Sequence, residues 1–198
     1  AFDLADRYRI PTMIIGDAMV GQMMEGVELD HLSEPEPVDK PWALTGASGR
    51  EPNVVHSFYL SQEDLEAFND RLEAKHARIQ KEVTRYQTVG CEEAEVLLVA
   101  FGTTARIARE VVDDPPAALK GKIGMLRPVT LWPFPYAPLR RFAEKVKGML
   151  TVETNAGQMV EDVRLAVDGR CPVELLGRPG GGFPSAGEMA DTLTSLFG

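Results

Sequence analysis

Polar or glycine-rich loops follow four apolar runs of the sequence, and they hold the residues that could bind a ligand. The loops are residues 102–104, 128–132, 154–158 and 177–182. In the first loop a predicted strand leads directly into a predicted helix. Backbone N–H groups at such a helix start attract anions, so a phosphate could bind there. Alternatively, Thr103 or Thr104 simply caps the helix.

The third loop, Glu153 to Gln158, ends a predicted strand and opens a helix. Asn155 and Gln158 offer both donors and acceptors, so they could bind a ligand amide or a partner's backbone. The other interpretation is a polar turn with Asn155 as the helix N-cap. The full set of candidate ligand, coenzyme A or interface residues is Thr103, Thr104, Arg127, Glu153, Asn155, Gln158 and Arg178.

Several familiar catalytic and metal-binding patterns are missing from the sequence. The glycine-rich run 177–182 lacks the Gly-Lys-Ser/Thr ending of a P-loop and is not a G-x-G-x-x-G motif. The histidines have no metal-ligand spacing, and two distant cysteines are too few for an iron–sulfur cluster. These residues are His31, His56, His76, Cys91 and Cys171. We therefore predict no metal site in this chain, and no set of Ser, His and Asp residues indicates a catalytic residue.

A regular strand–helix alternation from residue 95 onward must position these loops. Strands are expected at 95–101, 122–127, 149–153 and 172–176, and helices at about 104–113, 136–147 and 157–168. A capping box of Ser185 and Glu188 starts the last helix. This pattern predicts an α/β fold with a mostly parallel sheet and helices on both faces. Ligands of such sheets collect beyond the carboxyl ends of the strands.

The first 88 residues lack this alternation. Residues 1–25 resemble the end of another α/β domain, with a short helix before Pro11 and a buried strand at 12–15 that needs a sheet. Residues 26–60 predict an extended connector. A long helix over 61–86, within a segment that ends at 88, begins at an N-cap, Ser61, and suits a subunit or domain surface. The domain of alternating strands and helices would span 89–198.

Composition narrows the class of partner. The formal net charge is -9, which argues against a nucleic-acid surface. The apolar runs fall far short of the roughly 20 residues of a membrane helix. Two isolated cysteines favour reduced thiols, so we expect a cytoplasmic protein.

The sequence resembles the α-subunit of 2-oxoacid:ferredoxin oxidoreductases over essentially its whole length. The likeness is greatest to the branched-chain (2-oxoisovalerate) type, and the 2-oxoglutarate type follows. It is carried by Ile15-Gly16-Asp17, residues 21–25, 42–46, 49–55, 126–135, 155–164 and 177–181. The resemblance implies a C-terminal portion of the subunit, with a transketolase C-terminal-like domain after an extended arm and a long helix.

The resemblance also implies a reaction and its cofactors. The family oxidatively decarboxylates a 2-oxoacid with coenzyme A, giving acyl-CoA, CO2 and reduced ferredoxin. Thiamine diphosphate and magnesium would lie on the β-subunit, and iron–sulfur clusters outside the α-subunit. In this chain, Gly16-Asp17-Ala18 is the only near match to the Gly-Asp-Gly of a thiamine site. We therefore expect no cofactor bound by this chain alone, no activity by itself, and an oligomeric complex with the β-subunit and other subunits.

Two other functions remain open from the residues. One is a stand-alone Rossmann-like protein that binds a nucleotide or coenzyme A, which predicts ligand binding by the isolated chain. The other is a structural interaction module, which predicts association without a small ligand. The long helix and the extended arm favour association.

Overall fold

The computed structural model describes residues 1–26, 28–29 and 38–198. The chain forms two compact units. The first comprises Ala1–Ile15 and Met24–Ile79, and the second comprises Gly16–Met23 and Gln80–Gly198. Part of the connector predicted over 26–60, and His31 with it, lies outside the described residues. The boundaries predicted at 25, 60 and 88 stay predictions.

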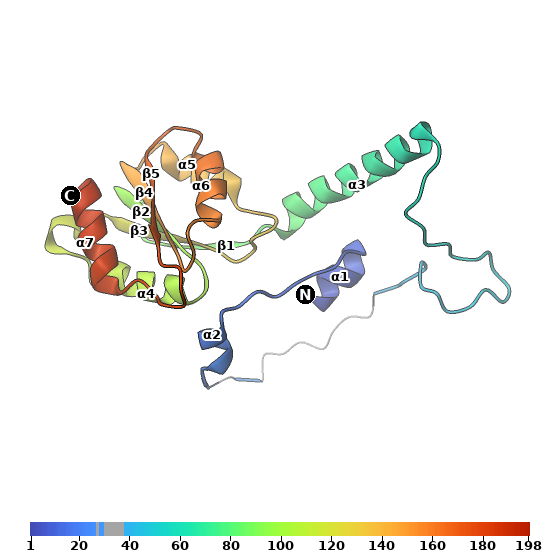
Figure 1. Ribbon diagram of the computed structural model, residues 1–198, viewed down its shortest axis with the longest axis horizontal. Coiled ribbons are helices and arrows are strands. Elements are labelled where there is room, and N and C mark those ends of the chain that lie inside the picture. Colours follow the sequence, from blue (N-terminus) through green and yellow to red (C-terminus); the bar gives the residue numbers. More distant parts are fainter. Residues whose placement is uncertain (27, 30–37) are drawn as a thin grey trace. The chain divides into compact units, whose positions relative to one another are not determined.

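A five-stranded sheet forms the centre of the second unit (Figure 1). Its strands lie in the order β1-β3-β2-β4-β5, and all neighbours are parallel except β1 with β3. The strands are β1 (Tyr86–Val89), β2 (Val96–Val99), β3 (Ile123–Pro128), β4 (Gly148–Glu153) and β5 (Val173–Gly177). The central strand β2 and its neighbour β4 are buried along their whole length because helices cover both faces of the sheet.

Helices α4 (Gly102–Asp113) and α7 (Ala186–Phe197) cover one face, and α5 (Tyr136–Ala143) and α6 (Met159–Val167) cover the other. Successive side chains of β2 point to opposite faces of the sheet, so they belong to two separate core clusters. Leu97 packs in the cluster with Phe142, whereas Leu98 packs in the cluster with Met189. A short 3-10 helix, η1 (Ala117–Leu119), precedes β3. The prediction of a mostly parallel sheet with helices on both faces is confirmed.

The antiparallel edge strand β1 was not predicted. The helix expected over 61–86 ends earlier, as α3 (Gln62–Val83), and Tyr86 pairs with Pro128 instead. The N–H of Arg85 donates to the Thr130 hydroxyl, which joins the turn after α3 to the strand ends. The run Tyr-Gln-Thr-Val is rich in residues that favour strands, and an available sheet edge outweighs the helical spacing. At the other end, Ser61 caps α3 as predicted, since its hydroxyl accepts from Asp64 N–H at 3.1 Å.

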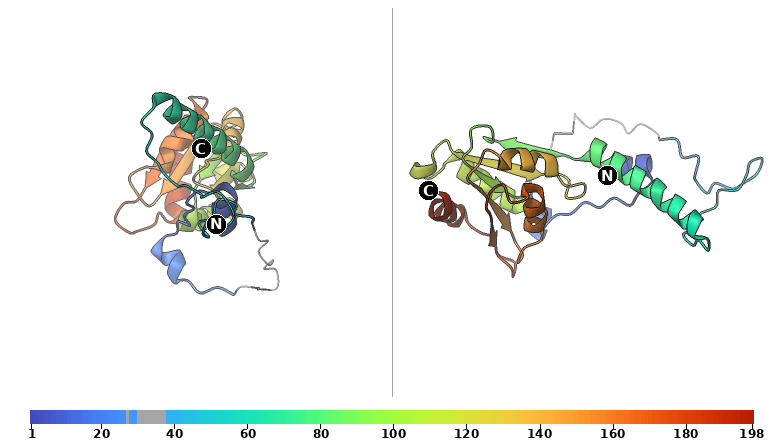
Figure 2. Two further views of the ribbon diagram at one scale, coloured as in Figure 1. Left: turned by 90° about the vertical axis from the view of Figure 1, so that its right-hand side faces the viewer. Right: turned by 90° about the horizontal axis from the view of Figure 1, so that it is seen from above.

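In the first unit, α1 (Phe2–Tyr8) lies beside α3 (Figure 2). Tyr8 is buried, and the Arg78 guanidinium lies over its ring, 5.5 Å from the centroid. Arg9 adopts the left-handed conformation at the end of α1 and stacks on Trp42, 4.9 Å from the ring centroid. The Lys75 ammonium donates to the Arg9 carbonyl. Cation–π and backbone contacts therefore hold this unit, with few buried apolar side chains.

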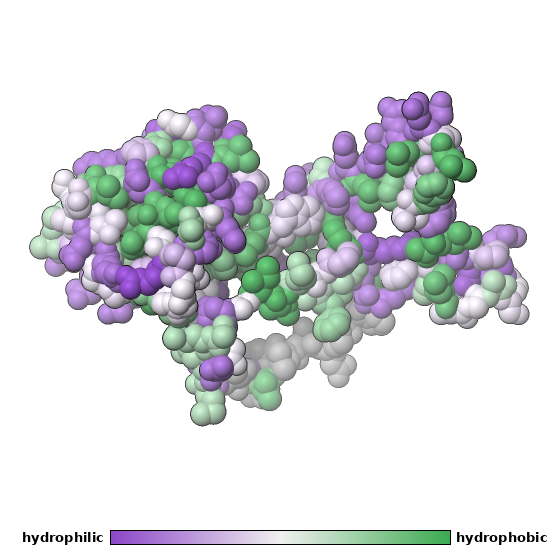
Figure 3. All heavy atoms as spheres, in the orientation of Figure 1, coloured by the Kyte–Doolittle hydropathy of each residue, from purple (hydrophilic) through white to green (hydrophobic). Residues whose placement is uncertain are grey.

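The buried strand predicted at 12–15 does not form within the described residues, and this segment does not join the sheet of the second unit. Met13 and Ile14 are 81% and 88% exposed, and the segment is extended without strand pairing. A strand needs neighbours, and none of the described residues offers it a sheet edge. Hydrophobic residues consequently lie on the surface along the segment between α1 and α2 (Figure 3). The chain then forms α2 (Ala18–Gln22), which belongs to the second unit. No helix among the described residues is long and apolar enough to span a bilayer.

Candidate functional site

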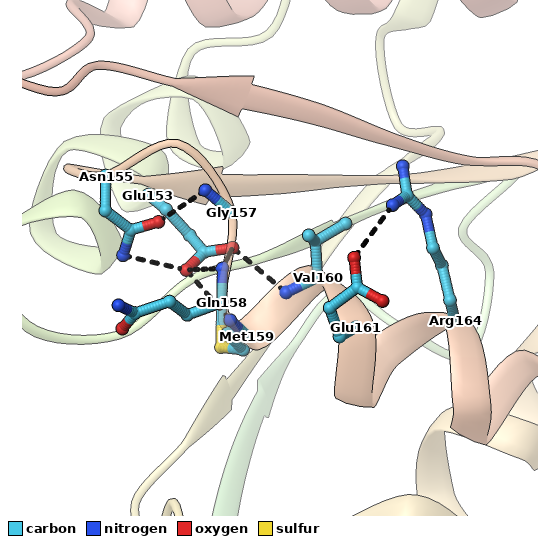
Figure 4. Close-up of polar contacts among 8 residues, drawn as sticks. All are labelled: Glu153, Asn155, Gly157, Gln158, Met159, Val160, Glu161 and Arg164. Carbon is cyan, nitrogen blue, oxygen red and sulfur yellow. Dashed lines mark hydrogen bonds and ion pairs between the residues drawn. The ribbon is translucent and has the colours of Figure 1, made fainter.

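The carboxylate of Glu153 organises the loop between β4 and α6 (Figure 4). Glu153 is the last residue of β4 and is only 2% exposed. Its carboxylate accepts hydrogen bonds from the N–H groups of Gln158 at 3.1 Å and of Met159 and Val160, both at 2.9 Å. These are N–H groups of the first turn of α6, which have no partner within the helix. Glu153 therefore occupies the place where an external anion would bind.

Asn155 closes the same loop without capping the helix. Its Oδ1 accepts from Gly157 N–H at 2.6 Å, and its Nδ2 donates to Glu153 at 3.1 Å. Gly157 has a φ of +116°, and a Cβ there would lie 3.0 Å from the Leu175 side chain, so the turn requires glycine. The polar-turn interpretation is right in outline, but the prediction that Asn155 is the N-cap is wrong. Gln158 holds that position, and its exposed side chain extends away from the carboxylate.

The start of α4 is arranged differently. Phe101 is the N-cap and makes no side-chain capping bond. Thr104 does not cap the helix as one interpretation predicted, because its hydroxyl donates to the Phe101 carbonyl at 2.7 Å. The acceptor for the Thr103 N–H is instead the Asp17 carboxylate, at 3.3 Å. Asp17 is also the N-cap of α2, where Val20 N–H donates to it at 2.9 Å. The Asp17 carboxylate thus accepts hydrogen bonds from the first turns of both α2 and α4.

Asp17 is therefore favoured in its ionised form. The Val20 N–H contributes most to holding the pKa of Asp17 below its usual value, and the Thr103 hydroxyl follows. In the sequence, Asp17 stands out only in the family resemblance and in the thiamine-site comparison, and this capping role was missed. The signal was local: Asp before Ala-Met-Val is a good N-cap, whereas its contact with Thr103, 86 residues away, could not be read from spacing.

The two candidate arginines make contacts within the fold. The Arg178 guanidinium pairs with Glu188 in the capping box of α7, and Arg178 N–H donates to the Glu153 carbonyl at 2.9 Å. Arg127 lies on the other side of β2 in the sheet, where it donates to Gln87 of β1 at 3.2 Å. The structure therefore brings Glu153, Asn155, Gln158 and the backbone of Arg178 together, and it separates Arg127 from them.

A cavity of about 510 Å³ opens beside α2, in the second unit. This size suits a small ligand. The cavity is lined by α2, by the residue before it, and by the loops that follow β4 and β5. None of the seven candidate residues is part of this lining. The lining residues are Asp17, Ala18, Met19, Gln22, Met23, Thr154, Gly181, Gly182 and Phe183. Within the described ranges, no group of three or more His, Cys, Asp and Glu side chains could hold a metal ion.

Comparisons with known proteins agree on one family. Residues 94–189 match the model of the pyruvate:ferredoxin oxidoreductase core domain II. The chain is 40% identical over 197 residues to the ketoisovalerate oxidoreductase subunit VorB of Methanothermobacter marburgensis, a match that covers 99% of the chain and 54% of that relative. It is 31% identical over 169 residues to the 2-oxoglutarate synthase subunit KorA of Archaeoglobus fulgidus, covering 82% of the chain and 47% of that relative.

A solved structure shares the fold. The 2-oxoglutarate:ferredoxin oxidoreductase from Magnetococcus marinus aligns with a TM-score of 0.55 at 17% identity, over 69% of this chain and 24% of that one. The chain spans about half the length of the curated relatives that it matches.

Proposed function

The chain belongs to the family of 2-oxoacid:ferredoxin oxidoreductase α-subunits, and from this membership we propose that it serves as the C-terminal portion of such a subunit. The complete complex would oxidatively decarboxylate 2-oxoisovalerate to an acyl-CoA and reduce ferredoxin in the cytoplasm. The observation that carries the proposal is the 40% identity to a ketoisovalerate oxidoreductase subunit over 99% of this chain.

The chemistry of the side chains supports a role in assembly. The buried carboxylate at the strand ends, Glu153, is fully used in capping α6. By contrast, the first unit exposes large apolar side chains along extended segments, including Ile14, Phe58 and Leu60, which are 88%, 74% and 90% exposed. Such exposed apolar side chains are expected where a partner covers the surface. In this proposal the extended segments contact the β-subunit or other parts of the complex.

The side chains that would hold an iron–sulfur cluster or magnesium are missing among the described residues. An iron–sulfur cluster takes four thiolates, and this sequence contains two cysteines, Cys91 and Cys171. The described part of the chain also lacks a cluster of acidic or histidine ligands for magnesium. Thiamine diphosphate, magnesium and the clusters would then be held by other polypeptide, and the isolated chain would be inactive.

A domain exchange tests the proposal. The matching half of the Methanothermobacter marburgensis subunit is replaced by this chain, and the complex is purified with its partner subunits. We expect the exchanged complex to assemble, to reduce ferredoxin with 2-oxoisovalerate, and to prefer this substrate to 2-oxoglutarate. The unexchanged complex is the control. Assembly measured by size-exclusion chromatography, combined with loss of 2-oxoisovalerate oxidation, would contradict the proposed function.

A second candidate function is binding of coenzyme A or a nucleotide, and the cavity beside α2 is the observation that favours it. If the chain is a stand-alone binder, calorimetry of the isolated chain should detect coenzyme A. If the cavity contributes only in the complex, coenzyme A should bind the exchanged complex and not the chain by itself. Replacing both Asn155 and Gln158 by alanine tests the predicted contribution of the neighbouring loop to the apparent affinity for coenzyme A.

A further inference from the structure

The N-terminus of α4 carries a buried hydroxyl that the fold satisfies poorly. Thr103 is 6% exposed, and its hydroxyl oxygen is fully buried. Among the described residues, no group forms a hydrogen bond of acceptable geometry with this oxygen. The hydroxyl nevertheless lies close enough to the Asp17 carboxylate to influence it. A buried hydroxyl without a partner costs roughly 1–3 kcal/mol, so its position is informative.

The Asp17 carboxylate fits this place imperfectly. Its hydrogen bond from the Thr103 N–H is long, at 3.3 Å, whereas its bond from Val20 within its own helix is 2.9 Å. A carboxylate has two oxygens, and here one accepts from Val20 and the other from Thr103. The Thr103 hydroxyl and the partial positive charge of a 12-residue helix are therefore incompletely satisfied.

The backbone at this point leaves room for an anion. Gly102 has a φ of +60°, which favours glycine, and the atom nearest to where its Cβ would lie is Asp17 Oδ2, at 3.5 Å. A side chain at position 102 would therefore border the space that the carboxylate occupies. The cavity beside α2, to which Asp17 contributes, lies next to this space and could hold the remainder of a larger ligand.

We propose that the N-terminus of α4 is a binding site for a phosphate group, and that the Asp17 carboxylate occupies it as an internal competitor. A phosphate brings more acceptor oxygens than a carboxylate, so it can accept from the Thr103 hydroxyl as well as from the first N–H groups of α4. The ligand class is a phosphate monoester whose apolar or neutral part enters the cavity beside α2. Binding would displace the Asp17 carboxylate from the Thr103 N–H.

The test is a titration of the 198-residue chain with inorganic phosphate, followed by the amide NMR signals of residues 102–104. Chloride at matched ionic strength is the control titration. Asp17→Asn keeps the size of the side chain and removes the competing charge, so it should tighten phosphate binding about tenfold, which corresponds to about 1.4 kcal/mol. Adding Thr103→Val to Asp17→Asn should weaken binding again by a similar factor, whereas adding Thr103→Ser should preserve it.

The titrations distinguish a phosphate site at the N-terminus of α4 from a nonspecific effect of salt. Shifts at residues 102–104 that strengthen in Asp17→Asn and depend on the hydroxyl at 103 support the site. Equal affinities for phosphate in the wild-type chain and in Asp17→Asn, or equal effects of phosphate and chloride, overturn it. Asp3→Asn, a charge removal in α1, is the matched control and should leave phosphate binding unchanged. Inorganic phosphate is used without any 2-oxoacid or coenzyme A, so this result does not depend on the proposed function.

Discussion

The Glu153 carboxylate accepts a hydrogen bond from the Val160 N–H at 2.9 Å, and through this contact the end of β4 caps the helix that follows it. Glu153 and Val160 are seven residues apart, so the cap does not come from the residue next to the helix. The arrangement ties the last residue of a fully buried strand to the first turn of α6. The loop geometry at this end of β4 therefore depends on the hydrogen bonds that one side chain accepts.

Replacing Glu153 by Gln should destabilise the fold by roughly 2–4 kcal/mol. The amide has similar size but loses the negative charge, and its NH2 group would face N–H donors. Urea unfolding followed by circular dichroism measures the loss. Glu161→Gln is the matched control, because Glu161 is exposed and pairs only at the surface with Arg164, at 3.3 Å. A loss no larger than that of the control would mean that Glu153 is dispensable for stability.

Replacing Gly124 in β3 by Ala should cost about 1–3 kcal/mol. A Cβ at this position would lie 2.9 Å from the Cα of Cys91 and 3.0 Å from the Cβ of Ala94, so backbone atoms would have to move. Gly187→Ala in α7 is the control, since the nearest atom to its Cβ would be the Ser185 hydroxyl oxygen at 3.9 Å. That change should be neutral or stabilise the helix by up to about 1 kcal/mol. Equal unfolding midpoints for the two variants would contradict the close approach at Gly124.

The sequence was sufficient to predict the parallel strands of the second unit and its helices α4 to α7, but not the short helix α2. The buried strand β2 is a continuous apolar run, the buried strand β4 is largely apolar, and the helices α4 to α7 carry their own periodicity or cap, as Ser185 shows for α7. These signals are local. The edge strand β1 was missed because its Tyr86 fits the helical spacing equally well, and only the available edge of β3 decides between the two.

Several contacts at the candidate site could not be predicted from local patterns in the sequence. The Asp17 contact with Thr103 joins segments 86 residues apart, and no pattern in the sequence indicates it. Thr104 was a good capping residue by type, but its hydroxyl donates to the Phe101 carbonyl instead. The strand expected near Ile14 failed for a related reason, because strand pairing needs a neighbour that a local pattern cannot supply.

Tyr136 should ionise late in an alkaline titration. Its hydroxyl donates to Asp162, which raises the pKa of Tyr136 from 10.0 to about 12, with burial as the next cause. Because the pKa of Tyr136 is raised in the folded state, its hydrogen bond to Asp162 stabilises the fold fully below the ordinary tyrosine pKa. This stabilisation is lost as the pH rises through about 12. The absorbance of tyrosinate against pH should contain a late step, which Tyr136→Phe removes. Asp162→Asn should move that step toward 10, and Tyr59→Phe should leave it in place.

The capping box of α7 should make the stability of the C-terminal helix depend on acid pH. The Ser185 N–H, followed by its hydroxyl, holds the pKa of Glu188 below its usual value, and the charge of Arg178 acts in the same direction. Because the pKa of Glu188 is lowered in the folded state, its contacts stabilise the fold fully above the ordinary glutamate pKa. This stabilisation is lost as the pH falls through the lowered pKa of Glu188. Ser185→Ala removes the acceptor for Glu188 N–H, so it should cost about 1 kcal/mol at neutral pH. The difference in unfolding free energy between Ser185→Ala and wild type, measured by urea unfolding, should shrink as Glu188 becomes protonated.

Ser195→Ala, an exposed change in the last turn of the same helix, is the control and should show neither the loss of stability nor its pH dependence. A loss of stability in Ser185→Ala that does not change with pH would rule out the coupling to Glu188.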